Sequence, residues 1–181
     1  MNPSKRYLAA LAHNLDQLQR AQLAWICTRG FSAAGSPKHL FAKVCLNALF
    51  NDYISKCAKV FELGGRPASI WYIERTDPTT LVEALQGGAA SLERMRNIAK
   101  RIKHLRDKDL MHIDESGVLD RERVWQEAAV EARELQFVVK EAMVALRRIV
   151  DHYRVDVPEL PRQFNGPRAR AIAKHLYAYL R

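Results

Sequence analysis

Residues 91–114, SLERMRNIAKRIKHLRDKDLMHID, determine the expected fold class. Apolar residues recur there every three or four positions, which is the period of one face of an α-helix. This stripe consists of Leu92, Met95, Ala99, Ile102 and Leu105. The spacing predicts an amphipathic helix that buries one face and exposes the other.

Three other segments of the chain show the same spacing. Their stripes are Leu8, Leu11, Leu15, Leu18 and Trp25; Leu46, Leu49, Phe50, Tyr53, Cys57, Val60 and Phe61; and Leu135, Val138, Ala142, Leu146, Ile149 and Tyr153. We expect the last segment to be one helix from Arg121, capped by Asp120 and roughly 50 Å long at 1.5 Å per residue. Four long helices with mostly short joins predict an all-α protein, an up-and-down antiparallel four-helix bundle.

Prolines and glycines mark the expected helix ends. A capping residue followed by Pro predicts helix starts at Pro3, Pro37, Pro78 and Pro167. Glycine predicts stops or turns at Gly30, Gly64–Gly65, Gly87–Gly88 and Gly117. Residues 66–88 then form a helical insertion with short helices around 70–73 and over 78–86, which caps one end of the bundle. We expect a bundle domain over 1–157 and a basic tail over 158–181, helical from about 167 to 179.

The composition points to a polyanionic partner. A net charge of +9 favours RNA or DNA over an anionic membrane surface, because Lys and Arg gain from releasing the counterions of phosphates. Cys27, Cys45 and Cys57 form no CxxC pair, so neither a disulfide framework nor a zinc site is expected. The chain shows no export signal and no membrane-spanning stretch, which predicts a cytoplasmic protein. It has no phosphate-binding glycine loop, and we expect no cofactor.

The end of the third helix is strongly basic. Arg106 falls on the apolar side, one turn beyond Ile102, where a merely solubilising charge is not expected. In an unbroken helix His112 would lie roughly 9 Å further along. The two would meet only if the helix ends near Met111 or if a second copy supplies a facing pair. The other cations of this helix are Arg94, Arg96, Lys100, Arg101 and Lys103.

The run Arg106-Asp107-Lys108-Asp109-Leu110-Met111-His112 resembles the signature of the HEPN superfamily: Arg, a polar residue, a short spacer and His. The form LRDKDLMHID is similar to that of abortive-infection members. It stands at the end of the third of four long helices, where HEPN proteins carry it, and the resemblance covers residues 4–154. The insertion at 66–88 and the tail from 158 lie outside the shared core.

The resemblance implies a metal-independent endoribonuclease of a prokaryotic defence or toxin–antitoxin system, acting as a homodimer on RNA. Arg106 would hold the phosphate, His112 would move protons, and Asp107 would orient one of them. Attack by the ribose 2′-OH would leave a 2′,3′-cyclic phosphate. A cognate antitoxin protein is a further partner of this class. The RNA-binding residues expected near the motif are Lys100, Arg101, Lys103 and Lys108.

Two roles are predicted for the tail, residues 158–181. It carries no acid after Glu159, and its basic residues alternate with aromatic ones, as in an RNA-binding arm. Alternatively, a small apolar stripe docks it on the bundle. The expected RNA-binding residues are Arg168, Arg170 and Lys174; the stripe is Ile172, Leu176, Tyr179 and Leu180.

Other roles are open for the motif. Arg106 could pair with Asp109 or Asp52 in a salt bridge, and His112 could cap the end of its helix. Histidines eight positions apart, at 104 and 112, do not have the usual spacing of helical metal ligands, so no metal is expected. The rival functions are a non-catalytic bundle that binds RNA or a nucleotide, and a helical module whose basic surface meets an acidic protein.

Overall fold

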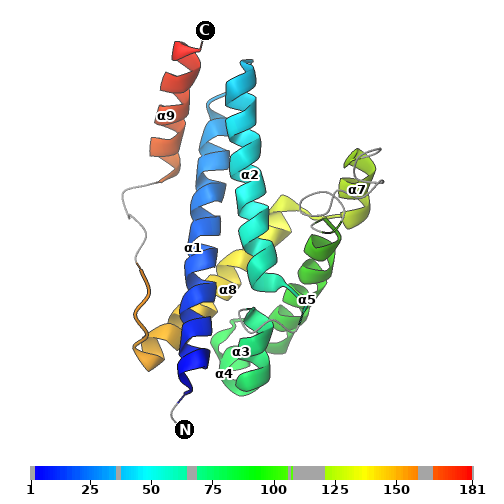
Figure 1. The fold of residues 1–181 in the computed structure, drawn as a ribbon, viewed down its shortest axis with the longest axis vertical. Coiled ribbons are helices and arrows are strands. Elements are labelled where there is room, and N and C mark those ends of the chain that lie inside the picture. Colours follow the sequence, from blue (N-terminus) through cyan, green and yellow to red (C-terminus); the bar gives the residue numbers. More distant parts are fainter. Residues whose placement is uncertain are drawn as a thin grey trace. The chain divides into compact units, whose positions relative to one another are not determined.

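A computed structural model describes residues 3–35, 38–64, 69–105, 107, 121–158 and 165–180. These residues form eight α-helices and no strand, which confirms the all-α prediction (Figure 1). Among them, no helix combines the length and the apolar character needed to cross a bilayer.

The chain forms two compact units. Unit 1 consists of Met1–Leu18 and Cys57–Pro158, and unit 2 consists of Gln19–Lys56 and Glu159–Arg181. Helices α1 (Lys5–Ala33) and α2 (Leu40–Phe61) each contribute residues to both units. The predicted domain division, with residues 1–157 in a single bundle, stays a prediction.

Unit 1 contains helices α3 (Ile70–Thr76), α4 (Pro78–Ala84), α5 (Gly88–Leu105), α7 (Arg121–Ala128) and α8 (Ala132–Tyr153). Helix α5 packs against α4, α7 and α8, while α4 also packs against α3 and α8. The apolar stripes predicted on α5 and α8 face this core. Their buried members are Leu92, Met95, Ala99, Ile102, Leu105, Leu135, Val138, Ala142, Leu146 and Ile149.

The two short helices predicted within residues 66–88 are confirmed as α3 and α4. Asp77 caps α4 through its Oδ1, which accepts a hydrogen bond from the backbone N–H of Thr80 at 3.1 Å, and Pro78 follows at the first helical position. The indole N–H of Trp71 donates to the carbonyl of Phe61 at 3.0 Å. This bond joins α3 to the end of α2.

The prediction of one continuous helix from Arg121 is wrong. Helix α7 ends at Ala128, and α8 begins only at Ala132. Ala129 adopts a positive φ of 48°, and its N–H donates to the carbonyl of Trp125, which closes α7. The apolar face of α7 packs on α5, where Val124 and Ala128 form a small cluster with Leu105. The chain turns at Ala129 because this packing and the α8 stripe require different helix directions.

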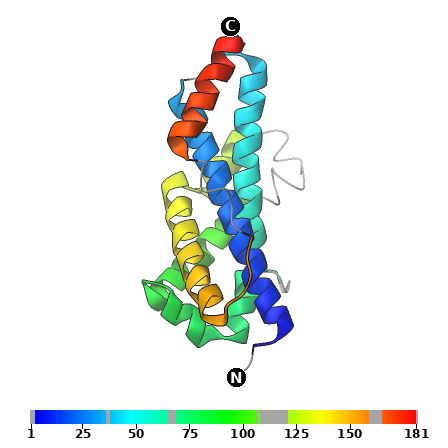
Figure 2. The same ribbon diagram turned by 90° about the vertical axis from the view of Figure 1, so that its left-hand side faces the viewer.

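Gly30 was predicted to end the first helix, and this prediction is also wrong. Helix α1 continues through Gly30 to Ala33. In unit 2, a Cβ on Gly30 would overlap the Cβ of Ala169 and lie 2.9 Å from the backbone nitrogen of Arg170, both in α9 (Gly166–Tyr179). Gly30 is therefore explained by the close packing of α1 and α9, which lie side by side in Figure 2, rather than by helix termination.

Unit 2 places α9 beside the last turns of α1. The helix predicted over 167–179 is confirmed, and the Asn165 side chain caps it by accepting from Arg168 N at 3.0 Å. Its buried residues are Ala169 and Ala173. Two members of the predicted docking stripe do not make this contact, since Ile172 is 45% exposed and Tyr179 is 94% exposed. Small side chains dock α9 because the two helix backbones approach so closely.

Aromatic contacts complete unit 2. The ring of Tyr53 is buried and lies 5.2 Å from the ring of Trp25, which agrees with the packing role predicted from its stripe. The ring of Tyr177 meets that of Phe31 edge-on at 6.2 Å, and its hydroxyl donates to the Phe31 carbonyl at 3.3 Å. These contacts join α1 to α2 and α1 to α9.

Candidate functional site

The predicted motif falls at the end of α5. Arg106, Lys108 and His112 lie outside the described residues, as do Asp109 and the predicted cap Asp120. Helix α5 ends at Leu105, which is fully buried against Val124 and Ala128. The residue immediately before the motif is therefore fixed in the core of unit 1.

Of the motif residues 106–112, the structure describes only Asp107. Its carboxylate accepts a hydrogen bond from Lys103 Nζ at 2.6 Å, one helical turn earlier. Both residues were predicted to serve the site, and the structure brings these two together. The orienting role of Asp107 toward Arg106 or His112 stays a prediction.

Arg101 holds the break between α7 and α8. Its Nη1 donates to the carbonyl of Ala129 at 2.7 Å, and its Nη2 lies 2.5 Å from Glu134 Oε1. The guanidinium thus satisfies a carbonyl that the interrupted helix leaves unpaired. Arg101 therefore stabilises the fold, whereas it was predicted from the sequence to bind RNA. Its neighbour Lys100 is exposed and forms no ion pair within the described part of the chain.

Replacing Arg101 by Ala is expected to lower the free energy of unfolding by about 1 kcal/mol, because the Ala129 carbonyl and Glu134 lose a charged partner that is partly exposed. Lys100→Ala, at the exposed neighbouring position, should leave stability unchanged. Urea unfolding followed by far-UV circular dichroism measures both. Equal free energies of unfolding for the two variants would show that the Arg101 contacts do not stabilise the fold.

The other arginines of α5 also bind within unit 1. Arg94 lies 3.5 Å from Glu141 and covers the ring of Phe137, at 4.8 Å from its centroid. Arg96 lies 3.0 Å from Glu74 of α3. Ser91 Oγ donates to Glu141 as well, at 2.5 Å. Most of the charge on this helix therefore serves packing against α3 and α8.

His104 and Tyr7 are two polar groups of unit 1 with unusual settings. His104 Nε2 lies 3.8 Å from Glu127, a separation that gives an ion pair only when the imidazole is protonated. The buried hydroxyl of Tyr7 finds no hydrogen-bond partner among the described residues, and burial, aided by Asp77, raises the pKa of Tyr7. Within the described ranges, no group of three His, Cys, Asp or Glu side chains is arranged to hold a metal ion.

Positive charge is concentrated in unit 2. That unit holds ten of the 29 Lys and Arg residues but only two of the 20 acids, so its net charge is +8. Unit 1 holds the remaining nineteen bases and eighteen acids, a net charge of +1. Almost the whole charge of the protein thus belongs to 61 residues, those numbered 19–56 and 159–181.

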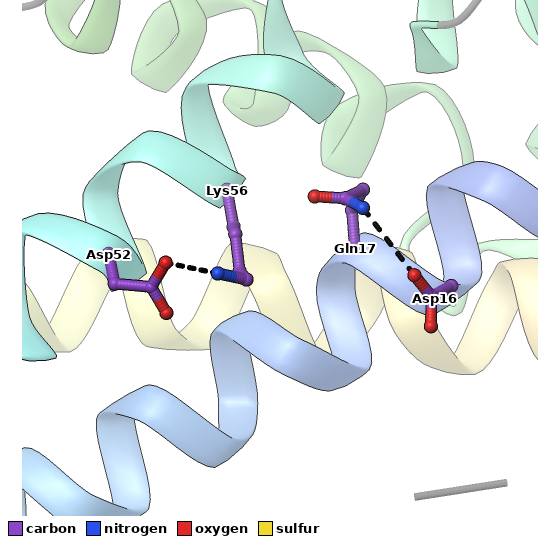
Figure 3. A network of polar contacts seen from close by, with 4 residues as sticks. All are labelled: Asp16, Gln17, Asp52 and Lys56. Carbon is purple, nitrogen blue, oxygen red and sulfur yellow. Dashed lines mark hydrogen bonds and ion pairs between the residues drawn. The ribbon is translucent and has the colours of Figure 1, made fainter.

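The acids of unit 2 are Asp52 and Glu159, and the second lies outside the described residues. Asp52 accepts a hydrogen bond from Lys56 on the next turn of α2 (Figure 3). Figure 3 also shows a bond in unit 1, from Gln17 Nε2 to Asp16 at 3.4 Å. Asp52 was one of the salt-bridge partners considered for Arg106, and it already has a cationic partner on its own helix.

The predicted RNA-binding residues Arg168, Arg170 and Lys174 are exposed on α9. Arg170 and Lys174 line one hollow together with Arg29 of α1. Arg29 was not among the residues predicted from the sequence, because only the packing of α9 on α1 brings it to this hollow. A signal for it existed, since the chain carries no acid between Asp16 and Asp52.

Comparison with known proteins found no match among family models, curated proteins or solved structures.

Proposed function

We propose that this chain is a metal-independent endoribonuclease of the HEPN type. The observation that carries the proposal is the run from Arg106 to His112, which directly follows the third long helix of the chain. The burial of Leu105 supports it, because the motif then directly follows a residue that is fixed in the core. In this proposal α1, α2, α5 and α8 form the four-helix bundle, and α3 and α4 are its insertion.

The proposed reaction is transesterification of RNA. The ribose 2′-oxygen forms a bond to the adjacent phosphorus as the bond from phosphorus to the 5′-oxygen breaks. One His112 removes the proton of the 2′-OH, and the other protonates the leaving 5′-oxygen. Arg106 presents its planar guanidinium to the phosphate oxygens, where negative charge builds in the transition state. The products are a 2′,3′-cyclic phosphate and a 5′-hydroxyl.

The proposal places the two motifs at one cleft of a homodimer, because a single helix would hold Arg106 and His112 too far apart to share a phosphate. Asp107 orients Arg106 or His112 in addition to its pairing with Lys103. The biological setting is a prokaryotic defence or toxin–antitoxin system in the cytoplasm, with a cognate antitoxin protein as a second partner.

The proposal is tested by incubating the purified protein with single-stranded and structured RNA in EDTA. We expect cleavage that leaves 2′,3′-cyclic phosphate and 5′-hydroxyl ends, identified by mass spectrometry. The matched control is the same RNA with 2′-deoxy sugar at the cleaved nucleotide, which should stay intact because it lacks the attacking oxygen. Ends with a 3′-hydroxyl and a 5′-phosphate would contradict the proposed chemistry.

One observation favours a second function, a non-catalytic module that binds RNA. The net charge of +8 belongs to unit 2, whereas the motif belongs to unit 1. A binding module would show tight, salt-sensitive association with RNA and no turnover. If an acidic protein were the partner instead, RNA should not compete with it for the basic surface.

A further inference from the structure

Helices α1 and α9 of unit 2 form an open hollow of about 620 Å³. Its lining includes three cations, Arg29 from α1 and Arg170 and Lys174 from α9. The rest of the lining is small: Gly30, Ala33, Gly166, Pro167 and Ala171. Small residues leave room for a ligand to approach, and the long cationic side chains can reach over it.

A second hollow of about 590 Å³ lies at the end of α1 and the C-terminal part of α9. Lys38, His39, Tyr177 and Lys174 contribute to its lining. Lys174 lines both hollows, so the two adjoin at this residue. A pair of adjoining hollows with cations in each suits an extended anion better than a single phosphate group.

The cations of these hollows are not neutralised by nearby acids. Within the described residues, Arg29, Lys38, Arg170 and Lys174 form no ion pair, and the carboxylate of Asp52 is bound to Lys56. Arg29 instead covers the ring of Trp25, 5.9 Å from its centroid. Uncompensated cations at one surface create a positive potential that attracts polyanions.

An exposed aromatic residue stands at the end of the same helix. Tyr179 is 94% exposed, whereas Tyr177 is held by its hydrogen bond to the Phe31 carbonyl. Tyr179 itself lines neither hollow, but its neighbours Ala178 and Leu180 line the second one. An exposed aromatic ring at this position can stack on an unpaired base.

We infer that the two hollows which α9 forms with α1 and with the residues after α1 bind the backbone of single-stranded RNA, with Arg29, Arg170, Lys174 and Lys38 on phosphates and Tyr179 stacked on a base. The inference rests on RNA being the substrate of the proposed function but does not require cleavage. It assigns RNA capture to unit 2, through residues that belong to neither the motif nor helix α5.

The test measures binding without cleavage. The full chain carrying His112→Ala is titrated into a fluorescein-labelled, unstructured 16-nucleotide RNA, and anisotropy is recorded at several salt concentrations. Arg170→Glu with Lys174→Glu is expected to weaken binding about tenfold or more and to reduce the salt slope by about 1.4, since each single-strand phosphate contact contributes about 0.7. Tyr179→Ala should weaken binding about fivefold or more through lost stacking.

The matched control is Arg133→Glu with Lys140→Glu, which changes the net charge equally at exposed positions of α8 in unit 1. It should bind RNA much more tightly than the α9 variant. Equal weakening by both pairs would overturn the inference, because only total charge would then matter. Arg170→Gln with Lys174→Gln provides a milder variant if charge reversal disturbs folding, and the same contrast with Arg133→Gln and Lys140→Gln is expected.

Two further outcomes separate this inference from the proposed function. RNA binding that depends on Arg170 and Lys174 in a wild-type protein without ribonuclease activity would refute the nuclease and retain the inference. Cleavage by the wild type together with unchanged binding by the α9 variant would refute the inference and retain the nuclease. Binding of the hollows to vesicles of anionic lipid in preference to RNA would also refute it.

Discussion

Replacing His112 by Ala is expected to lower the rate of RNA cleavage by about 10²- to 10⁴-fold, which is the usual contribution of a positioned acid or base. Without the imidazole, neither the 2′-OH nor the leaving 5′-oxygen has a group that titrates near neutral pH. Single-turnover cleavage, with the enzyme in excess over the RNA and well above the binding constant, isolates this chemical step. The binding constant itself should change little.

Arg106→Ala should lower cleavage by about 10²- to 10³-fold, because the phosphate loses a preorganised charge in the transition state. His13→Ala, at an exposed position of α1, is the matched control and should cleave as the wild type does. All three variants should keep the far-UV signal of the all-helical chain. Undiminished cleavage in both motif variants would refute the site, and activity from a monomer would refute the shared cleft.

Gly30→Ala is expected to destabilise the protein by about 1–3 kcal/mol, the usual cost of overpacking. The direction is informative, because Ala in place of Gly within a helix otherwise stabilises by roughly 0.5–1 kcal/mol. Here the new Cβ would overlap that of Ala169 and lie 2.9 Å from the backbone nitrogen of Arg170. Hydrogen exchange of the α9 amides, with urea unfolding of the whole chain, measures the effect.

The control for Gly30→Ala is Gly166→Ala on α9, where an added Cβ meets no atom within 4 Å. A second variant, Gly30→Ala with Ala169→Gly, removes the Ala169 Cβ with which the new Cβ overlaps. It should recover part of the lost free energy of unfolding, and this recovery measures the coupling between the two positions. Recovery stays partial because the contact with the Arg170 backbone remains. Faster exchange in Gly166→Ala than in Gly30→Ala would contradict the close helix contact.

Local signals in the sequence were sufficient for several elements. The period of Leu92, Met95 and Ile102 predicted the buried face of α5, and Asp77 before Pro78 predicted the start of α4. In each case, residues within one or two turns decide the structure. Tyr53 was assigned to the core for the same reason, and it is fully buried.

Long-range contacts decided what the sequence did not reveal. Residues 129–131 are Ala-Val-Glu, without Gly or Pro, so nothing local marks the break between α7 and α8. Packing of Val124 on Leu105 and the bond from Arg101 to the Ala129 carbonyl set it there. Gly30 shows the reverse case, in which a typical helix-stop residue serves a contact with α9 nearly 140 positions later.

At the candidate site, too, the sequence did not reveal the long-range contacts. Sequence spacing placed six cations on the third helix but could not show their partners, and the structure pairs Arg94, Arg96, Arg101 and Lys103 with carboxylates. Conversely, Arg29 lies 141 positions before Arg170, and only the packing of α9 on α1 brings them to one hollow. The pairing of Arg106 with His112 stays a prediction, since both lie outside the described residues.

Helices α1 and α2 run without interruption past two of the three points where the chain passes from one unit to the other, at residues 18–19 and 56–57. Domains that recombine in evolution are usually separated by exposed linkers, where a cut breaks few contacts. Here a cut at either boundary would fall inside a helix. Gene fusion or shuffling could therefore not transfer the basic unit to another protein by itself, and the two units should have been inherited together.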